Sequence, residues 1–95
     1  LIAARLDPLP IDALRRLASE LIERESCVVL LSTPKDGGDM LLFARSSSVS
    51  ADMSALLRQT VSEIGGKGGG RSDFAQGSSP NECAVDHAAA ILRAK

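Results

Sequence analysis

The chain has 95 residues, of which 44% are hydrophobic, so it can bury one compact core but not a second domain. Its 11 Lys and Arg residues against 12 Asp and Glu residues leave a net charge of -1, which excludes nucleic-acid binding by bulk charge alone and leaves only a local basic site. No apolar run reaches the roughly 20 residues of a transmembrane helix, and there is no signal-peptide pattern, so we expect a cytoplasmic protein without membrane contacts. The chain starts with Leu1 rather than Met, and we expect residues 1–95 to be a single domain excised from a longer protein.

The first half of the chain predicts one helix and two strands. Apolar residues recur at helical spacing over residues 11–25, with charged residues between them, which is typical of an amphipathic helix. A short, partly β-branched apolar run at 27–31 fits a strand buried on both faces. A polar turn at 35–39 separates it from a second apolar run at 40–44, so the pair predicts a β-hairpin.

The second half predicts a helix, a glycine loop, a short strand and a last helix. A serine-rich stretch can supply the N-cap of the first of these helices, which must end at Gly65. Residues 73–76 predict a third strand. Ser79 as N-cap, Pro80 at the first helical position and Glu82 as the partner in a capping box predict the start of the last helix.

The order α-β-β-α-glycine loop-β-α predicts an α/β (α+β) fold, in which a small mixed β-sheet of about three or more strands carries helices packed on it. The second helix is expected to cross over between the second and third strands. Cys27 and Cys83 have no CxxC spacing, so neither a zinc site nor a disulfide framework is indicated, and we expect two buried thiols.

The segment 65–71 is the feature that packing does not explain. Its five glycines surround one lysine, and we expect this density to exclude the interior of a helix or strand, because each glycine loses much backbone entropy without a side chain to pack. Glycines expose amide N–H groups to an anion, while Lys67 and Arg71 add positive charge, so we predict a loop that binds the backbone of a nucleic acid. The predicted binding residues are Gly65, Gly66, Lys67, Gly68, Gly69, Gly70 and Arg71. The predicted supporting residues are Arg45, Arg58, Phe74 and Gln76.

The residues themselves argue against several other functions. A P-loop needs Ser or Thr after its lysine and a strand before it, but Gly68 follows Lys67 and the loop follows a helix. His87 beside Asp86 has no visible nucleophile partner, which favours a packing or exposed histidine and a non-catalytic chain. The absence of Trp and Tyr argues against a base-stacking platform, so backbone and shape recognition of folded RNA is expected.

The alternative for the glycines of residues 65–71 is that they only turn the chain or let helices and strands pack closely.

Residues 65–77, GGKGGGRSDFAQG, resemble the signature of the DHH-associated domain at the C-terminus of alanyl-tRNA synthetases. Residues 43–45 and 52–57 look closer still to the C-terminal domain of long-form AlaX proteins, the free-standing editors of mischarged alanyl-tRNA. The resemblance covers the chain from about residue 27 onward. It implies an accessory domain that helps to bind tRNA or assists dimerisation, attached to the rest of a parent enzyme, an alanyl-tRNA ligase or an alanyl-tRNA deacylase. It also implies that zinc serves only an upstream editing domain, so that this chain holds no cofactor and does not hydrolyse.

The same kind of domain accompanies DHH phosphoesterases, where a histidine that contacts substrate typically follows the glycines. Arg71 follows Gly70 in this chain, and this departure favours the alanyl-tRNA branch. Two alternatives stay open, an accessory nucleic-acid-binding domain of a DHH phosphoesterase and a dimerisation or interdomain docking module that uses the apolar faces of the first and last helices.

Overall fold

The computed structural model describes residues 1–35, 37–80 and 83–94, and these form one five-stranded sheet and three helices. The elements in chain order are β1 (Ile2–Arg5), α1 (Ile11–Arg24), β2 (Val28–Lys35), β3 (Gly38–Arg45), α2 (Met53–Ile64), β4 (Lys67–Gly70), β5 (Phe74–Ser79) and α3 (Ala84–Arg93).

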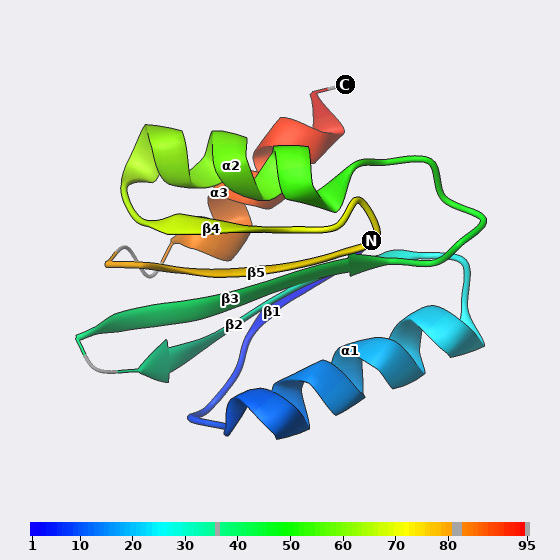
Figure 1. The fold of residues 1–95 in the computed structure, drawn as a ribbon, viewed down its shortest axis with the longest axis horizontal. Helices are drawn as coiled ribbons and strands as arrows, with labels where there is room; N and C mark the ends of the chain where they lie inside the picture. The colour runs from blue at the N-terminus through cyan, green and yellow to red at the C-terminus, as the bar shows by residue number, and fades with distance from the viewer. Residues whose placement is uncertain (36, 81–82, 95) are drawn as a thin grey trace.

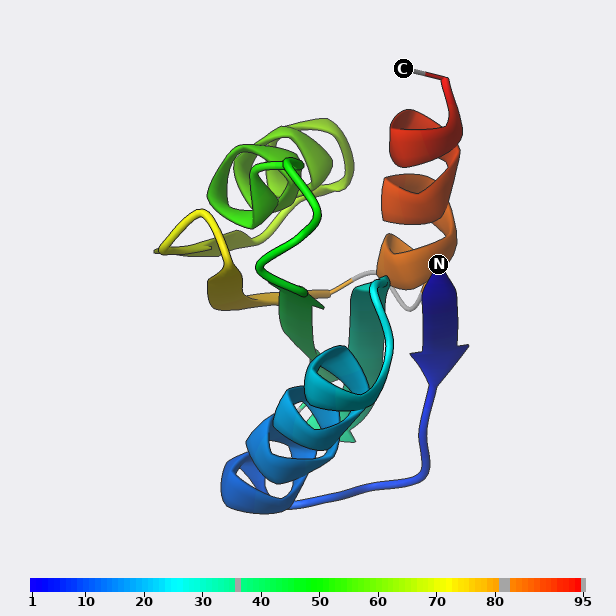
Figure 2. The same ribbon diagram turned by 90° about the vertical axis from the view of Figure 1, so that its right-hand side faces the viewer.

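The sheet has the strand order β1-β2-β3-β5-β4. Strand β1 is parallel to β2, and every other neighbouring pair is antiparallel. Helix α1 lies on one face of the sheet, and α2 and α3 lie on the other (Figure 1). Seen at a right angle to that view, β1 and β4 form the two opposite edges (Figure 2).

The predicted mixed sheet with helices packed on it is confirmed, and so is the buried hairpin. Strand β2 is buried on both faces, because Val29 and Leu31 join the apolar cluster under α1 while Val28 and Leu30 join the cluster under α2 and α3. Helix α1 begins at the predicted residue and ends one residue early, and α2 ends immediately before Gly65 as expected.

Two strands were not predicted from the sequence. Residues 67–70 form strand β4 rather than a loop, so the expectation that glycine density excludes a strand is wrong: pairing with β5 overrides the low strand propensity of glycine. Strand β1 is short and alanine-rich, and it forms by pairing with β2 across the α1 connection. The crossover through α2 therefore leads to β4, and β5 then returns between β3 and β4.

Both predicted helix starts need correction. The N-cap of α2 is Asp52, whose carboxylate accepts a hydrogen bond from the Ala55 N–H at 3.1 Å, rather than a serine. Helix α3 begins at Ala84, and Ser79 instead ends β5, where its hydroxyl donates to the Gly65 carbonyl at 2.7 Å. The predicted capping partner Glu82 lies outside the described residues.

The two cysteines differ in burial. Cys27 is buried where the chain leaves α1 for β2, whereas Cys83 is exposed at the start of α3. The expectation of two buried thiols is therefore wrong for Cys83, which precedes the first turn of α3 and is open to solvent.

The helices cover the sheet unevenly. Helix α1 packs on β2 and β3, whereas α2 packs on β3, β4 and β5. The β4–β5 hairpin is therefore covered by a helix on its α2 side only. This arrangement determines which side chains of the glycine segment can meet a partner.

Candidate nucleic-acid interface

The glycine segment turns the chain from α2 into an edge strand. Gly65 ends α2 with a φ of 93°, and Gly66 follows with a φ of 124°, a conformation that side chains rarely adopt. A Cβ on Gly66 would also collide with the backbone of Ser78. The alternative that these glycines serve close packing is therefore correct for Gly66. Strand β4 begins at the next residue and pairs with β5 on one side only.

The alternation of side chains along β5 defines the faces of this hairpin. Phe74 packs against the cluster under α1, and Ala75 is buried in the cluster under α2 and α3. Gln76 and Ser78 therefore point to the α1 side, because successive side chains alternate across a strand.

Directly opposed residues on antiparallel strands share a face, and the register pairs Lys67 with Ser78 and Gly69 with Gln76. Lys67, Gly69, Gln76 and Ser78 thus form one polar surface, which we call the open face. The side chains of Lys67, Gln76 and Ser78 are exposed, because α1 packs on β2 and β3 instead.

A pocket of about 410 Å³ adjoins one end of the open face, and it is basic. Lys67 and Lys35 both line it, together with the backbone of the β2–β3 turn. Asp39 also lines the pocket, but its carboxylate points to the α2 and α3 side of the sheet, as those of Leu41 and Phe43 do, and accepts hydrogen bonds from Arg5 Nε at 2.8 Å and from Arg5 Nη2 at 3.1 Å. The two lysines therefore dominate the charge of the pocket.

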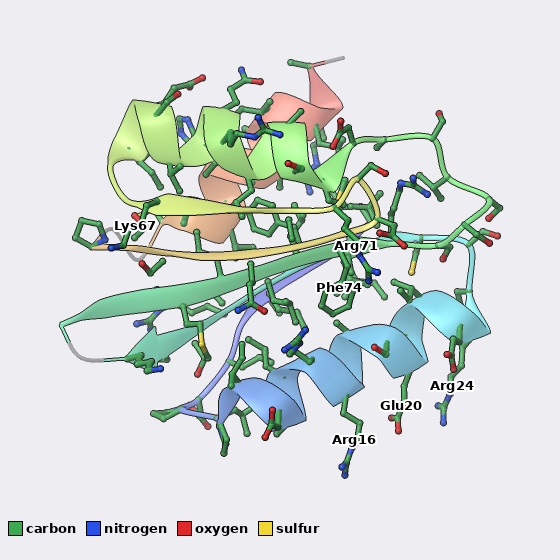
Figure 3. The ribbon with its side chains drawn as sticks, viewed as in Figure 1. Arg16, Glu20, Arg24, Lys67, Arg71 and Phe74 are labelled. Atoms are coloured by element: carbon green, nitrogen blue, oxygen red, sulfur yellow. The ribbon has the colours of Figure 1, made fainter. Side chains whose placement is uncertain are left out.

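Two arginines lie at the other end of the hairpin, Arg71 in the turn after β4 and Arg45 at the end of β3. The Arg71 side chain is 80% exposed, and its Nε lies 3.6 Å from the Asp73 carboxylate. Arg45 donates from Nε to the Ser72 carbonyl at 3.2 Å and lines the same hollow as Arg71. Arg45 thus supports the turn that presents Arg71. Figure 3 shows Lys67 and Arg71 at opposite ends of β4.

Phe74 acts as an anchor. It is partly buried against the apolar cluster under α1, and the guanidinium of Arg15 lies 5.9 Å from the centroid of its ring. Figure 3 shows the ring pointing toward α1. This cation–π contact occupies the face that a base would need for stacking.

The structure does not bring every predicted residue to this surface. Arg58 belongs to α2, on the opposite side of the sheet, where it donates to the Ser54 hydroxyl at 2.6 Å. His87 connects α3 to α2, with its Nε2 2.8 Å from Glu63 Oε1. The hydrogen bonds from His87 and then Gln59 lower the pKa of Glu63. Only the His87–Glu63 contact joins two helices, and both it and Arg58 lie apart from the open face.

Residues 1–95 match the family model described as the DHHA1 domain. The chain belongs to the DHHA1 domain family. The family resemblance noted for residues 65–77 is thereby confirmed, and the match also includes β1 and α1.

This DHHA1 domain is similar to part of several alanine–tRNA ligases. It is 38% identical over 94 residues to the ligase of Herpetosiphon aurantiacus, a match that covers 95% of this chain and 11% of the ligase. It is 34% identical over 96 residues to the ligase of Thiobacillus denitrificans, covering 98% of this chain and 11% of the ligase. It is 39% identical over 94 residues to the ligase of Acidothermus cellulolyticus, covering 92% of this chain and 11% of the ligase. The chain spans only that small share of these relatives.

A solved structure shares the fold of this DHHA1 domain. The C-Ala domain of the Aquifex aeolicus alanyl-tRNA synthetase matches it with a TM-score of 0.84 at 24% sequence identity, and the match covers 97% of this chain and 86% of that domain. The five-stranded sheet with helices on both faces is therefore the architecture of a known domain.

Two basic residues near the open face of this DHHA1 domain were not predicted from the sequence. Lys35 reaches the Lys67 pocket because the tip of the β2–β3 hairpin lies beside the start of β4. Arg15 reaches Phe74 because α1 lies near the start of β5. Both contacts join residues far apart in the chain, and no local pattern signals them.

Two searches of the described residues, 1–35, 37–80 and 83–94, gave no candidate. No group of three or more His, Cys, Asp or Glu side chains there is arranged to hold a metal ion. No helix there is both long and apolar enough to cross a membrane.

Proposed function

We propose that this DHHA1 domain is the C-terminal accessory domain of an alanine–tRNA ligase, and that it binds tRNA without catalysing a reaction. The observation that carries the proposal is the position of the cations: Lys67 and Lys35 lie at one end of the exposed hairpin, and Arg71 and Arg45 lie at the other. Membership of the DHHA1 family and the ligase relatives support the choice of RNA partner.

The spacing of these cations suits a polyanion. A β-strand rises about 3.3 Å per residue, so Lys67 and Arg71 lie about 13 Å apart along β4. Two cationic points at that separation fix the direction of a phosphate backbone, whereas a single point would not. The net charge of -1 means that binding depends on this local arrangement.

The recognition we propose uses backbone and shape. Phe74 packs against the apolar cluster under α1, and Arg15 of that helix lies over its ring, so the open face presents polar side chains and glycine backbone instead of a stacking ring. Such a surface suits folded RNA, which proteins recognise through shape, phosphates and 2′-hydroxyls. The domain would act in the cytoplasm with the rest of its parent chain, and zinc would serve only an upstream editing domain.

The test is binding of the chain to tRNA over a salt series, with the double variant Lys67→Ala/Arg71→Ala beside the wild type. Each lost phosphate contact lowers the slope of log affinity against log salt by about one unit. Arg58→Ala is the matched control, because it removes a cation from the opposite side of the sheet. Equal affinity and slope in the wild type and the double variant would refute a direct role for these residues.

A docking or dimerisation module is the second candidate, favoured by β1 and β4, which are the outer strands of the sheet that the described residues form. It predicts a mass in sedimentation that rises with protein concentration and does not change in Lys67→Ala. A constant monomer mass would exclude self-association.

A further inference from the structure

The fold accounts for seven of the eight glycines of the chain. Each of these seven has a positive φ or would place a Cβ closer than 3.0 Å to a backbone atom. They are Gly37, Gly38, Gly65, Gly66, Gly68, Gly70 and Gly77. A larger residue at any of these positions would strain the chain or displace a neighbouring strand.

Gly69 is the exception. A Cβ built on it meets no atom within 4 Å, and its φ lies outside the range that favours glycine. Its neighbours in β4 differ: a Cβ on Gly68 would lie 2.8 Å from a side-chain carbon of Leu57, and one on Gly70 would lie 2.7 Å from the Phe74 carbonyl oxygen. The missing side chain at position 69 would point into open space.

Glycine at such a position carries a cost that the fold does not require. A glycine inside a strand loses more conformational entropy on folding than any other residue and contributes no side chain to pack. On the open face, Lys67 lies two residues before Gly69, and Gln76 lies directly opposite it. A partner that touches this face therefore meets bare backbone flanked by a cation and an amide.

We propose that Gly69 is a contact point for RNA, at which the RNA lies flush against the backbone of β4. This inference rests on the proposed function and adds to it the surface that the RNA contacts. That surface is the centre of the open face, rather than the tips of its charged side chains. Without a side chain at position 69, the RNA can approach β4 closely enough for Gln76 and Ser78 to donate hydrogen bonds to phosphate or ribose oxygens. Lys67 then supplies the charge at one end.

The test distinguishes the effect of a close approach of the RNA to β4 from the effect of the Lys67 charge on tRNA binding. Gly69→Ala and Gly69→Val add side chains where there is space, and valine also suits a strand, so neither should lower the melting temperature. Both should hold the RNA away, and because dispersion attraction falls steeply with even a sub-ångström gap, we expect about tenfold weaker tRNA binding for valine and a smaller loss for alanine. Since no ion contact is lost, the salt slope should stay at the wild-type value, whereas Lys67→Ala should reduce it by about one unit.

The matched control is Ala3→Val, which adds the same kind of side chain to an exposed residue of β1 at the opposite edge of the sheet. Its tRNA affinity should equal that of the wild type. A titration followed by amide NMR detects even weak binding, and the signals of Lys67, Gly69 and Gln76 should shift more than those of β1.

Each outcome decides between the two proposals. If Gly69→Val binds tRNA as tightly as the wild type while Lys67→Ala binds less tightly, flush docking is wrong and the proposed function stands. If tRNA shifts no amide signal of the wild-type chain, both are wrong. If Gly69→Val changes only the sedimentation of the protein, the bare backbone serves pairing with a second copy, and docking of RNA at this position is excluded.

Discussion

Arg5 of β1 reaches past β2 to hold Asp39 of β3 with two hydrogen bonds, from Nε at 2.8 Å and from Nη2 at 3.1 Å. The Asp39 side chain is only 2% exposed, while Arg5 is 42% exposed, so the ion pair shields a buried carboxylate from one side. This carboxylate lies on the α2 and α3 side of the sheet, on the same side of β3 as Leu41 and Phe43. Arg5 therefore ties the edge strand β1 to β3 across β2.

Arg5→Gln should reduce the stability of the domain. Removing one partner leaves a buried charge without compensation, and we expect a loss of about 2–3 kcal/mol in the free energy of unfolding, measured by urea denaturation. Arg16→Gln is the control, because Arg16 points away from the sheet on α1 (Figure 3). Equal unfolding midpoints for the two variants would contradict this role of Arg5.

Lys35→Ala should weaken tRNA binding as Lys67→Ala does, although the two lysines are far apart in the chain. They share one pocket beside the open face, so each would contact the same stretch of backbone. Each single variant should reduce the salt slope by about one unit and the double variant by about two. A wild-type slope for Lys35→Ala would show that the RNA does not extend over the β2–β3 turn.

The elements of this fold that the sequence predicts are those with a clear local pattern of apolar residues. Helix α1 and the hairpin of β2 and β3 follow from runs of apolar residues with clear spacing. Strands β1 and β4 have no such signal, because Ala3 and Ala4 are poor strand formers and glycine is poorer still. Their partner strands supply the structure, and that pairing is visible only in the folded chain.

The residues of the candidate site could likewise be predicted only where they are close together in the sequence. The sequence placed Lys67 and Arg71 in one segment, but it contained nothing that put Lys35 beside Lys67 or placed Arg58 on the far side of the sheet. Glycine density predicts a loop, whereas most of these glycines let β4 and β5 approach closely. Density alone does not reveal that only position 69 is left without such a reason.

Gly66→Ala should destabilise the domain, and Gly69→Ala should not. Gly66 has a φ of 124°, and its Cβ would collide with the Ser78 carbonyl oxygen, so we expect the free energy of unfolding to fall by about 1–3 kcal/mol or more. Both variants make the same chemical change three residues apart, which makes the second a control for the first. The midpoints of urea denaturation give the comparison. Equal midpoints would mean that the start of β4 can shift without cost.

The stability that the contact between α2 and α3 contributes should decrease at acid pH, because Glu63 becomes protonated there. Its pKa is lowered chiefly by the hydrogen bond from His87 and next by the one from Gln59. A carboxyl whose pKa is lower in the folded state stabilises that state above its ordinary pKa of 4.5, and this contribution disappears as the pH falls through the lowered value. Wild type should therefore melt at a higher temperature than Glu63→Gln near neutral pH, and the difference should vanish in strong acid.

Two further variants identify the cause of that difference. His87→Ala removes the main hydrogen bond, so the pKa of Glu63, followed by the NMR shift of its carboxyl carbon, should rise toward its ordinary value. Glu20→Gln removes an equal charge from the outer side of α1, where the side chain points away from the sheet (Figure 3), and should leave the pH dependence unchanged. If the pKa of Glu63 in His87→Ala matched that of the wild type, the hydrogen bond between the helices would not be what holds it low.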